Sequence, residues 1–154
     1  ALTMTRKLPL DTLQELARTQ KEEAARRLGL LQSAQVSAHQ KLDLLLQYRH
    51  DYAQQLQSLM AHGLPASQWR NFNNFLGTLD GAIEQQRAIL KQAGLRLDRG
   101  RGDWQHQARR LNSFDTLADR LRRQDLAAQA KREQRDSDER AARKFIDRAA
   151  QPNF

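Results

Sequence analysis

Four histidines are the residues of this chain that could most readily bind a metal ion or carry a proton near neutral pH. They are His39, His50, His62 and His106. A metal site needs several such ligands close together, but His39 and His50 would share a helix face about 16 Å apart. The spacing therefore predicts no metal site.

Neighbouring carboxylates are a second source of chemistry, because one can act as an acid while the other acts as a base. Glu22 and Glu23 are adjacent, and another acidic group lies within residues 136–139. Nothing around them predicts a fold that excludes water, and the chain has no glycine-rich phosphate loop and no nucleophile elbow. We interpret these carboxylates as solvated helix faces. The sequence predicts no catalytic residue and no cofactor, so we do not expect an enzyme.

Aromatic side chains gather in one stretch of the sequence, on both sides of a Gly-Leu-Pro turn. Five of the nine rings lie there: Tyr48, Tyr52, Trp69, Phe72 and Phe75. Gly63 suits the left-handed position that ends a helix, and Pro65 cannot continue a helix but can stand just before one. The sequence therefore predicts a turn at about 62–66 between two helices.

Apolar residues on either side of this turn recur in alternating steps of three and four, which is the heptad pattern of a coiled coil. We call these positions the seam. Before the turn the seam comprises Leu10, Ala17, Ala24, Leu28, Leu31, Ala38, Leu42, Leu45, Tyr52, Leu56 and Leu59. After the turn it comprises Trp69, Phe72, Leu76, Leu79, Ile83, Leu90, Ala93, Leu97, Gly100, Trp104, Leu111, Phe114, Ala118 and Leu121. Its polar members are Gln14, Lys21, Gln35, Arg49, Gln86 and Gln107.

The seam predicts an all-α fold class, namely an elongated antiparallel two-helix coiled-coil hairpin that forms one domain over residues 1–154. The helices are expected at about 9–61 and 67–149. The shortest turn places Gly100 opposite Leu28, which gives a packing role to a glycine that otherwise costs a helix about 1 kcal/mol. The same register predicts an overhang of the second helix from about residue 119, without a partner in its own chain.

Two rings near the turn are not explained by the seam. Tyr48 and Phe75 each fall one position beside it. One interpretation is a partly exposed aromatic patch that binds a partner, and the other is that these wide rings shield the edge of the seam. The residues alone leave both interpretations open.

Composition narrows the class of protein. The net charge of +8 and a pI of about 10.6 favour an acidic protein, a nucleic acid or an anionic lipid as partner, although charged flanks are also usual in coiled coils. No run approaches the roughly 20 apolar residues of a transmembrane segment, and the first residues lack the apolar core of a secretory signal. The chain contains no cysteine. We therefore expect a cytoplasmic protein.

Four stretches of the sequence resemble the flagellar FliJ family. They are "LDTLQELA" at Leu10–Ala17, "AARRLG" at Ala24–Gly29, "LLLQYRHDY" at Leu44–Tyr52 and "WRNFNNFLGTLDGAIEQQR" at Trp69–Arg87. The resemblance implies a soluble component of the flagellar type III export ATPase complex. Its fold would be similar to the two-helix stalk of the rotary-ATPase γ subunit, and its terminal helices would enter the pore of a hexameric ATPase.

The resemblance also implies binding partners, at the cytoplasmic face of the inner membrane at the flagellar base. A surface near the turn would dock on the cytoplasmic domain of the export gate, at Leu45, Tyr48, Tyr52, Phe75, Leu79, Ala82 and Gln86. The overhang supplies the candidates for contacts with the ATPase ring: Arg120, Arg122, Arg123, Arg132, Arg135 and Arg143. Export chaperones are a further class of partner, for which no residue is assigned.

Two other functions compete with this one. A basic coiled coil that binds nucleic acid would explain the charge, but it predicts aromatic residues interleaved with arginines along one exposed face. Here the rings cluster at the turn instead. A purely structural homodimeric coiled coil would require the seam to be filled between two chains. The export role is preferred, with no nucleic acid as partner.

Overall fold

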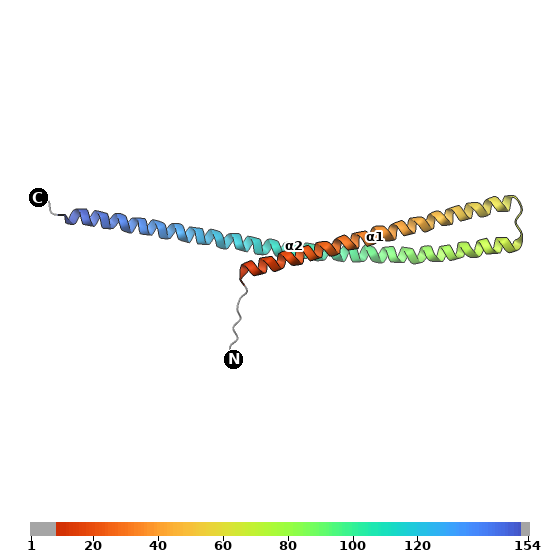
Figure 1. Ribbon diagram of the computed structural model, residues 1–154, viewed down its shortest axis with the longest axis horizontal. Helices are drawn as coiled ribbons and strands as arrows, with labels where there is room; N and C mark the ends of the chain where they lie inside the picture. The colour runs from red at the N-terminus through yellow and green to blue at the C-terminus, as the bar shows by residue number, and fades with distance from the viewer. Residues whose placement is uncertain (1–8, 152–154) are drawn as a thin grey trace, which may run out of the picture. The chain divides into compact units, whose positions relative to one another are not determined.

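The computed structural model describes residues 9–151 and contains two helices in this range. Helix α1 spans Leu10–Ala61 and helix α2 spans Ala66–Ala150. They pack against each other as an antiparallel hairpin, which confirms the predicted all-α fold class (Figure 1). Contacts divide the chain into two units. One is Arg18–Ala108, and the other combines the start of α1, as far as Ala17, with the part of α2 from Arg109 onward.

The loop between the helices forms as its glycine and proline predict. Gly63 has a φ of 83°, a left-handed value that side chains disfavour, and its N–H donates to the Met60 carbonyl at 3.3 Å. The Pro65 carbonyl accepts from the N–H groups of Gln68 and Trp69, both at 3.1 Å. Pro65 therefore stands immediately before α2, whose first residue is Ala66.

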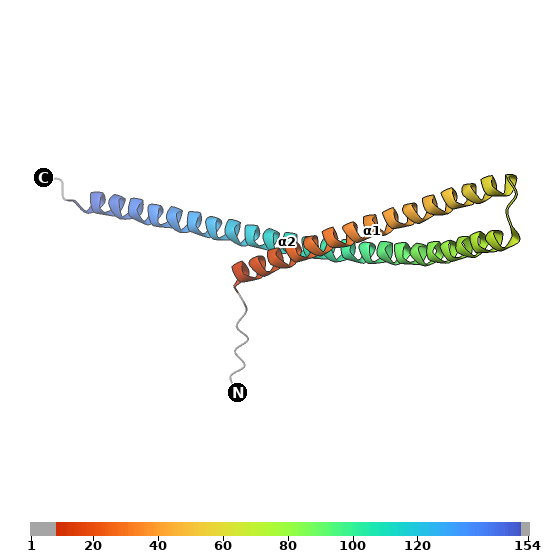
Figure 2. The same ribbon diagram turned by 45° about the vertical axis from the view of Figure 1, so that its right-hand side comes forward.

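The core of the Arg18–Ala108 unit is the predicted seam. Figures 1 and 2 show the two helices of this unit side by side from different directions. The buried residues there are Ala24, Ala38, Leu42, Leu56, Leu79, Ile83, Gln86, Leu97 and Gly100. All of them are seam positions. Burial of each large aliphatic side chain contributes about 1.5–3 kcal/mol, so the seam is the main source of stability of the hairpin.

Contacts between the helices establish the register. The carboxylate of Asp80 pairs with Arg49, the ring of Tyr52 lies on Phe72, and the Gln86 amide donates to the backbone of Ala38. Each of these contacts lies within four residues, about one helical turn, of the register that places Gly100 opposite Leu28. The loop length and the heptad spacing were therefore sufficient to predict how the helices face each other.

The second unit has its own short core. Ala17 and Leu111 are buried, and the Gln14 side chain donates to the Asp115 carboxylate at 2.9 Å. From Asp119 to Gln151 every residue is exposed. We call the helical part of this stretch, residues 119–150, the arm.

Three predicted seam residues are exposed. The assignment of two of them, Leu59 and Trp69, to the core was wrong. Leu59 and Trp69 are 37% and 42% exposed, and Leu121 is 44% exposed. Leu59 and Trp69 stand beside the loop, where each helix ends and offers few neighbours. Leu121 belongs to the fully exposed arm, as the predicted overhang from about residue 119 implies. The heptad pattern continues into helix ends that no facing helix covers.

Candidate functional site

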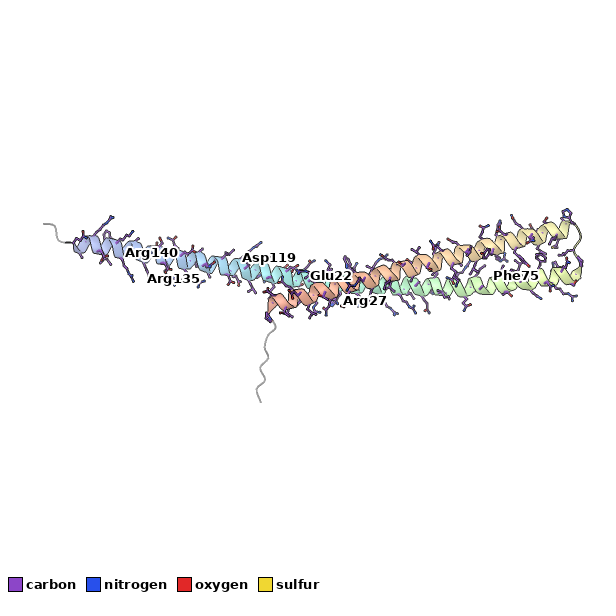
Figure 3. All side chains as sticks on the ribbon, viewed as in Figure 1. Glu22, Arg27, Phe75, Asp119, Arg135 and Arg140 are labelled. Carbon is purple, nitrogen blue, oxygen red and sulfur yellow. The ribbon has the colours of Figure 1, made fainter. Side chains whose placement is uncertain are left out.

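An aromatic cluster lies in the hairpin near the loop. The Tyr52 ring contacts two rings of α2, with centroid distances of 4.8 Å to Phe72 and 4.5 Å to Phe75. The rings are tilted by 33° and 53°, within the range of favourable aromatic packing. Tyr52 and Phe72 are half-buried, whereas Phe75 is 45% exposed. Phe75, labelled in Figure 3, therefore packs against Tyr52 while part of its own ring remains accessible.

Tyr48 lies one helical turn before Tyr52 on α1 and is 53% exposed. Its exposure matches its position beside the seam. Tyr48 and Phe75 are thus the two exposed rings among the residues predicted to bind the export gate. An exposed ring supplies a large apolar contact area with little loss of side-chain freedom, as is typical of residues that dominate protein interfaces. We call Tyr48, Tyr52 and Phe75 the aromatic surface.

The other residues of the predicted gate site are less accessible. Leu45 and Ala82 are half-buried, and Leu79 is buried. Gln86 is only 4% exposed, and its Nε2 atom donates to the Ala38 carbonyl at 3.0 Å. Because Leu79 and Gln86 fill the space between the helices, they can influence a partner only by positioning the residues around them.

One ion pair borders this region. The Arg49 guanidinium donates through Nε and Nη2 to the two carboxylate oxygens of Asp80. The hydrogen bond from Arg49 lowers the pKa of Asp80, and the same hydrogen bond raises the pKa of Arg49. Both side chains are exposed, so solvent and salt weaken the pair. Its geometry joins α1 to α2 and supports the register.

The arm carries the arginines that were predicted to contact the hexameric ATPase. The six are Arg120, Arg122, Arg123, Arg132, Arg135 and Arg143, and each is exposed. Figure 3 shows side chains projecting on both sides of this segment, where Arg135 is labelled. The Nη1 atom of Arg122 lies 3.6 Å from the carboxylate of Asp119, one turn away on the same helix. The arm therefore presents its charges to solvent.

Sequence reasoning described the arm only by its charge and missed its apolar residues. Leu126, Phe145 and Ile146 are 59%, 75% and 62% exposed. The signal was present, because large apolar side chains are unusual in a segment this polar. A protein that binds the arm would therefore meet apolar as well as cationic side chains.

Two of the histidines make local contacts within α1 or at its end. His39 Nδ1 lies 3.1 Å from the Asp43 carboxylate, and His62 Nδ1 lies 2.8 Å from the Ser58 carbonyl. Among residues 9–151, no three side chains of the types that bind metals lie close enough together to hold an ion. In the same range, neither helix has a stretch apolar enough to span a membrane.

Comparisons with known proteins agree with the sequence resemblance. The family model described as "Flagellar FliJ protein" matches residues 6–150. Proteins named "Flagellar FliJ protein" from Salmonella typhi and Escherichia coli (strain K12) are each 34% identical to this chain over 134 residues. These alignments cover 87% of this chain and 91% of either relative. The residues matched by the family model include both the aromatic surface and the arm.

Proposed function

Because the chain belongs to the FliJ family of flagellar proteins, we propose that it is a non-enzymatic component of the flagellar protein export apparatus. It promotes assembly and activity of the hexameric export ATPase and couples this ATPase to the cytoplasmic domain of the export gate. One observation carries the proposal. The chain presents an exposed aromatic surface in one unit and a fully exposed, arginine-rich arm in the other.

The aromatic surface is the part proposed to bind the gate. Tyr48 and Phe75 are accessible, and the Phe75 ring packs against the Tyr52 ring. A ring that is already packed on one side loses little freedom when a partner covers the other side. The seam beneath these residues remains intact when they bind, so docking requires no opening of the hairpin.

The arm is the part proposed to enter the ATPase ring. Its arginines are exposed and would favour a lumen that offers carboxylates. Exposed charges of this kind accelerate and orient association more than they hold the final complex. The exposed Phe145 and Ile146 supply apolar area that can be buried once the arm is in place.

Charge reversal in the arm tests the ATPase role. The double variant Arg122→Glu/Arg123→Glu should abolish stimulation of the purified ATPase hexamer at moderate salt, because carboxylates would then face carboxylates. A matched control is Arg26→Glu/Arg27→Glu, which reverses an equally adjacent and exposed arginine pair on α1. Unchanged stimulation by the first variant, or equal loss with both, would remove the arm from the mechanism.

Removal of the two exposed rings tests the gate role. The double variant Tyr48→Ala/Phe75→Ala should keep its helicity, measured by circular dichroism, and bind the gate's cytoplasmic domain at least about tenfold more weakly. Leu95→Ala serves as the control, because this outward-facing leucine is 52% exposed and is remote from the rings in sequence. A large drop in melting temperature for the double variant would mean instead that the rings belong to the core.

The two competing functions make different predictions. Binding to nucleic acid would be tight at low salt and would weaken steeply as salt is added, without any need for the ATPase. A structural homodimer would sediment as a stable dimer at low concentration. A homodimer held by the seam is less favoured, because α1 and α2 of one chain already bury the seam residues against each other.

The proposed location is the cytoplasmic face of the inner membrane at the flagellar base, where the chain would be peripheral and held by its protein partners. Export chaperones remain a further class of partner in this proposal. No described residue is assigned to them. Imaging of the export ATPase with and without this chain, to look for density in the pore, is the most direct test of the whole arrangement.

A further inference from the structure

The loop end of the hairpin is almost free of charge. From Tyr52 to Leu79 the chain contains a single Lys, Arg, Asp or Glu residue, namely Arg70, although 29% of the whole chain is charged. This stretch includes the last part of α1, the loop and the first part of α2. Exposed helices of monomers are normally rich in charge, whereas the centres of protein interfaces are depleted of it.

The same end exposes large apolar side chains. Met60 is 53% exposed and Trp69 is 42% exposed, and together with Leu64 and Ala66 they line a shallow depression of about 370 Å³. We call these four residues the loop pocket. Trp and Met are enriched in interfaces relative to the rest of protein surfaces, and Trp is the residue that most often dominates binding energy.

The loop pocket is continuous with the aromatic surface but is not part of it. Trp69 and Phe72 are three residues apart and therefore neighbours on α2. Phe72 contacts Tyr52, and Tyr52 contacts Phe75. A row of rings thus leads from the loop pocket to the surface proposed to bind the gate.

Apart from Arg70, most of the polar residues at this end carry amide side chains rather than charges. Gln55, Gln57, Gln68, Asn71 and Asn74 are all exposed. A helix that lies on an anionic membrane normally carries Lys and Arg on its polar face, and a nucleic-acid site needs them to neutralise phosphates. Neutral hydrogen-bonding groups around exposed apolar anchors fit a protein surface of low charge instead.

We propose that the loop end inserts into an uncharged, apolar-lined concavity of the export gate's cytoplasmic domain, in which Trp69 and Met60 are buried. This inference rests on the proposed function, since it names the gate as the partner. It extends the contact from one flank of the hairpin to its end, and the gate must therefore enclose the loop rather than meet only Tyr48 and Phe75.

Binding measurements with the full chain separate this inference from the proposed function. Trp69→Ala should weaken binding of the gate's cytoplasmic domain at least about tenfold, and Met60→Ala should weaken it by a smaller factor. Leu95→Ala, with nearly the same exposure as Met60, should bind like the wild type. If the wild type itself fails to bind, the proposed function is wrong. If it binds and Trp69→Ala binds equally well, only the present inference is wrong.

A spectroscopic measurement tests burial of the ring directly. The chain has two tryptophans, so Trp104→Phe leaves Trp69 as the single site for 5-fluorotryptophan, after circular dichroism has verified the fold. With the gate domain added, the ¹⁹F resonance should shift and lose its sensitivity to exchange of H₂O for D₂O. Retention of that sensitivity in the bound state would overturn the inference. So would loss of it with phosphatidylethanolamine–phosphatidylglycerol vesicles but not with the gate domain, which would identify a membrane as the partner.

Discussion

Leu31 of α1 lies directly against Gly100 of α2. A Cβ atom added to this glycine would come within 2.5 Å of the Leu31 Cδ1 atom and 3.7 Å of the Leu28 Cδ1 atom. Atoms do not approach so closely without displacement of one of them. The absence of a side chain at Gly100 therefore allows the leucine of the facing helix to occupy the seam.

Substitution of this glycine should be unfavourable even though glycine is a poor helix former. Gly100→Leu gains about 1 kcal/mol of helix propensity but overpacks the seam, which typically costs about 1–3 kcal/mol, so we expect a lower melting temperature. Gly81→Leu is the matched control, because Gly81 has no neighbouring atoms within 4 Å of an added Cβ. It should raise the melting temperature. Equal increases for both variants would contradict the close approach at Leu31.

Two seam glutamines should respond in opposite ways to the same substitution. The Gln107 Oε1 atom is buried without a hydrogen-bond partner, whereas Gln86 donates to the Ala38 carbonyl. Gln107→Met removes an unsatisfied group and should raise the free energy of unfolding by about 1 kcal/mol. Gln86→Met removes a formed hydrogen bond and should not raise it. Urea unfolding of the two variants in parallel provides the comparison.

Acid should weaken the Arg49–Asp80 pair. The pKa of Asp80 is lowered in the folded state, so the pair adds stability above the unfolded pKa of about 4 and loses it as the pH falls through the folded value. Wild type should therefore melt slightly above Asp80→Asn at pH 7. The difference should vanish in acid and shrink in high salt. A difference that grows in acid would contradict the assigned ion pair.

Salt should distinguish the two proposed contacts. Binding of the arm to the ATPase depends on arginines and should weaken as ionic strength rises from low to moderate values. Binding of the gate depends on rings and a nearly uncharged loop end, so its dissociation constant should change little over the same range. Calorimetry of each pair across a salt series measures both. An equal salt dependence of the two dissociation constants would contradict the assignment of the ATPase contact to the arginines and of the gate contact to the rings.

Most of the fold could be predicted from the sequence, because a coiled-coil hairpin has few variables. The heptad spacing identifies the buried face, and Gly63 with Pro65 locates the loop. The register follows from the loop length. It was correct to about one turn. Gly100 lies near Leu28, as predicted, but Leu31 comes closer to it. A difference of this size depends on how side chains interdigitate.

The candidate site was less predictable. The exposure of Tyr48 and Phe75 could be read from their positions beside the seam. The exposure of Trp69 could not, because a periodic pattern does not show where its partner helix stops covering it. Which partner meets each surface came only from the family resemblance, since charge and exposed rings fit several classes of partner.

The uncovered state of the arm has a consequence for locating partners. Its backbone amide protons are protected only by hydrogen bonds of a single unsupported helix, which open easily and locally. In the free protein they should exchange with deuterium far faster than those of the seam near Leu42 and Ile83. Any protein that encloses the arm will therefore slow this exchange residue by residue, and the length of the slowed segment will measure how deeply the arm is inserted.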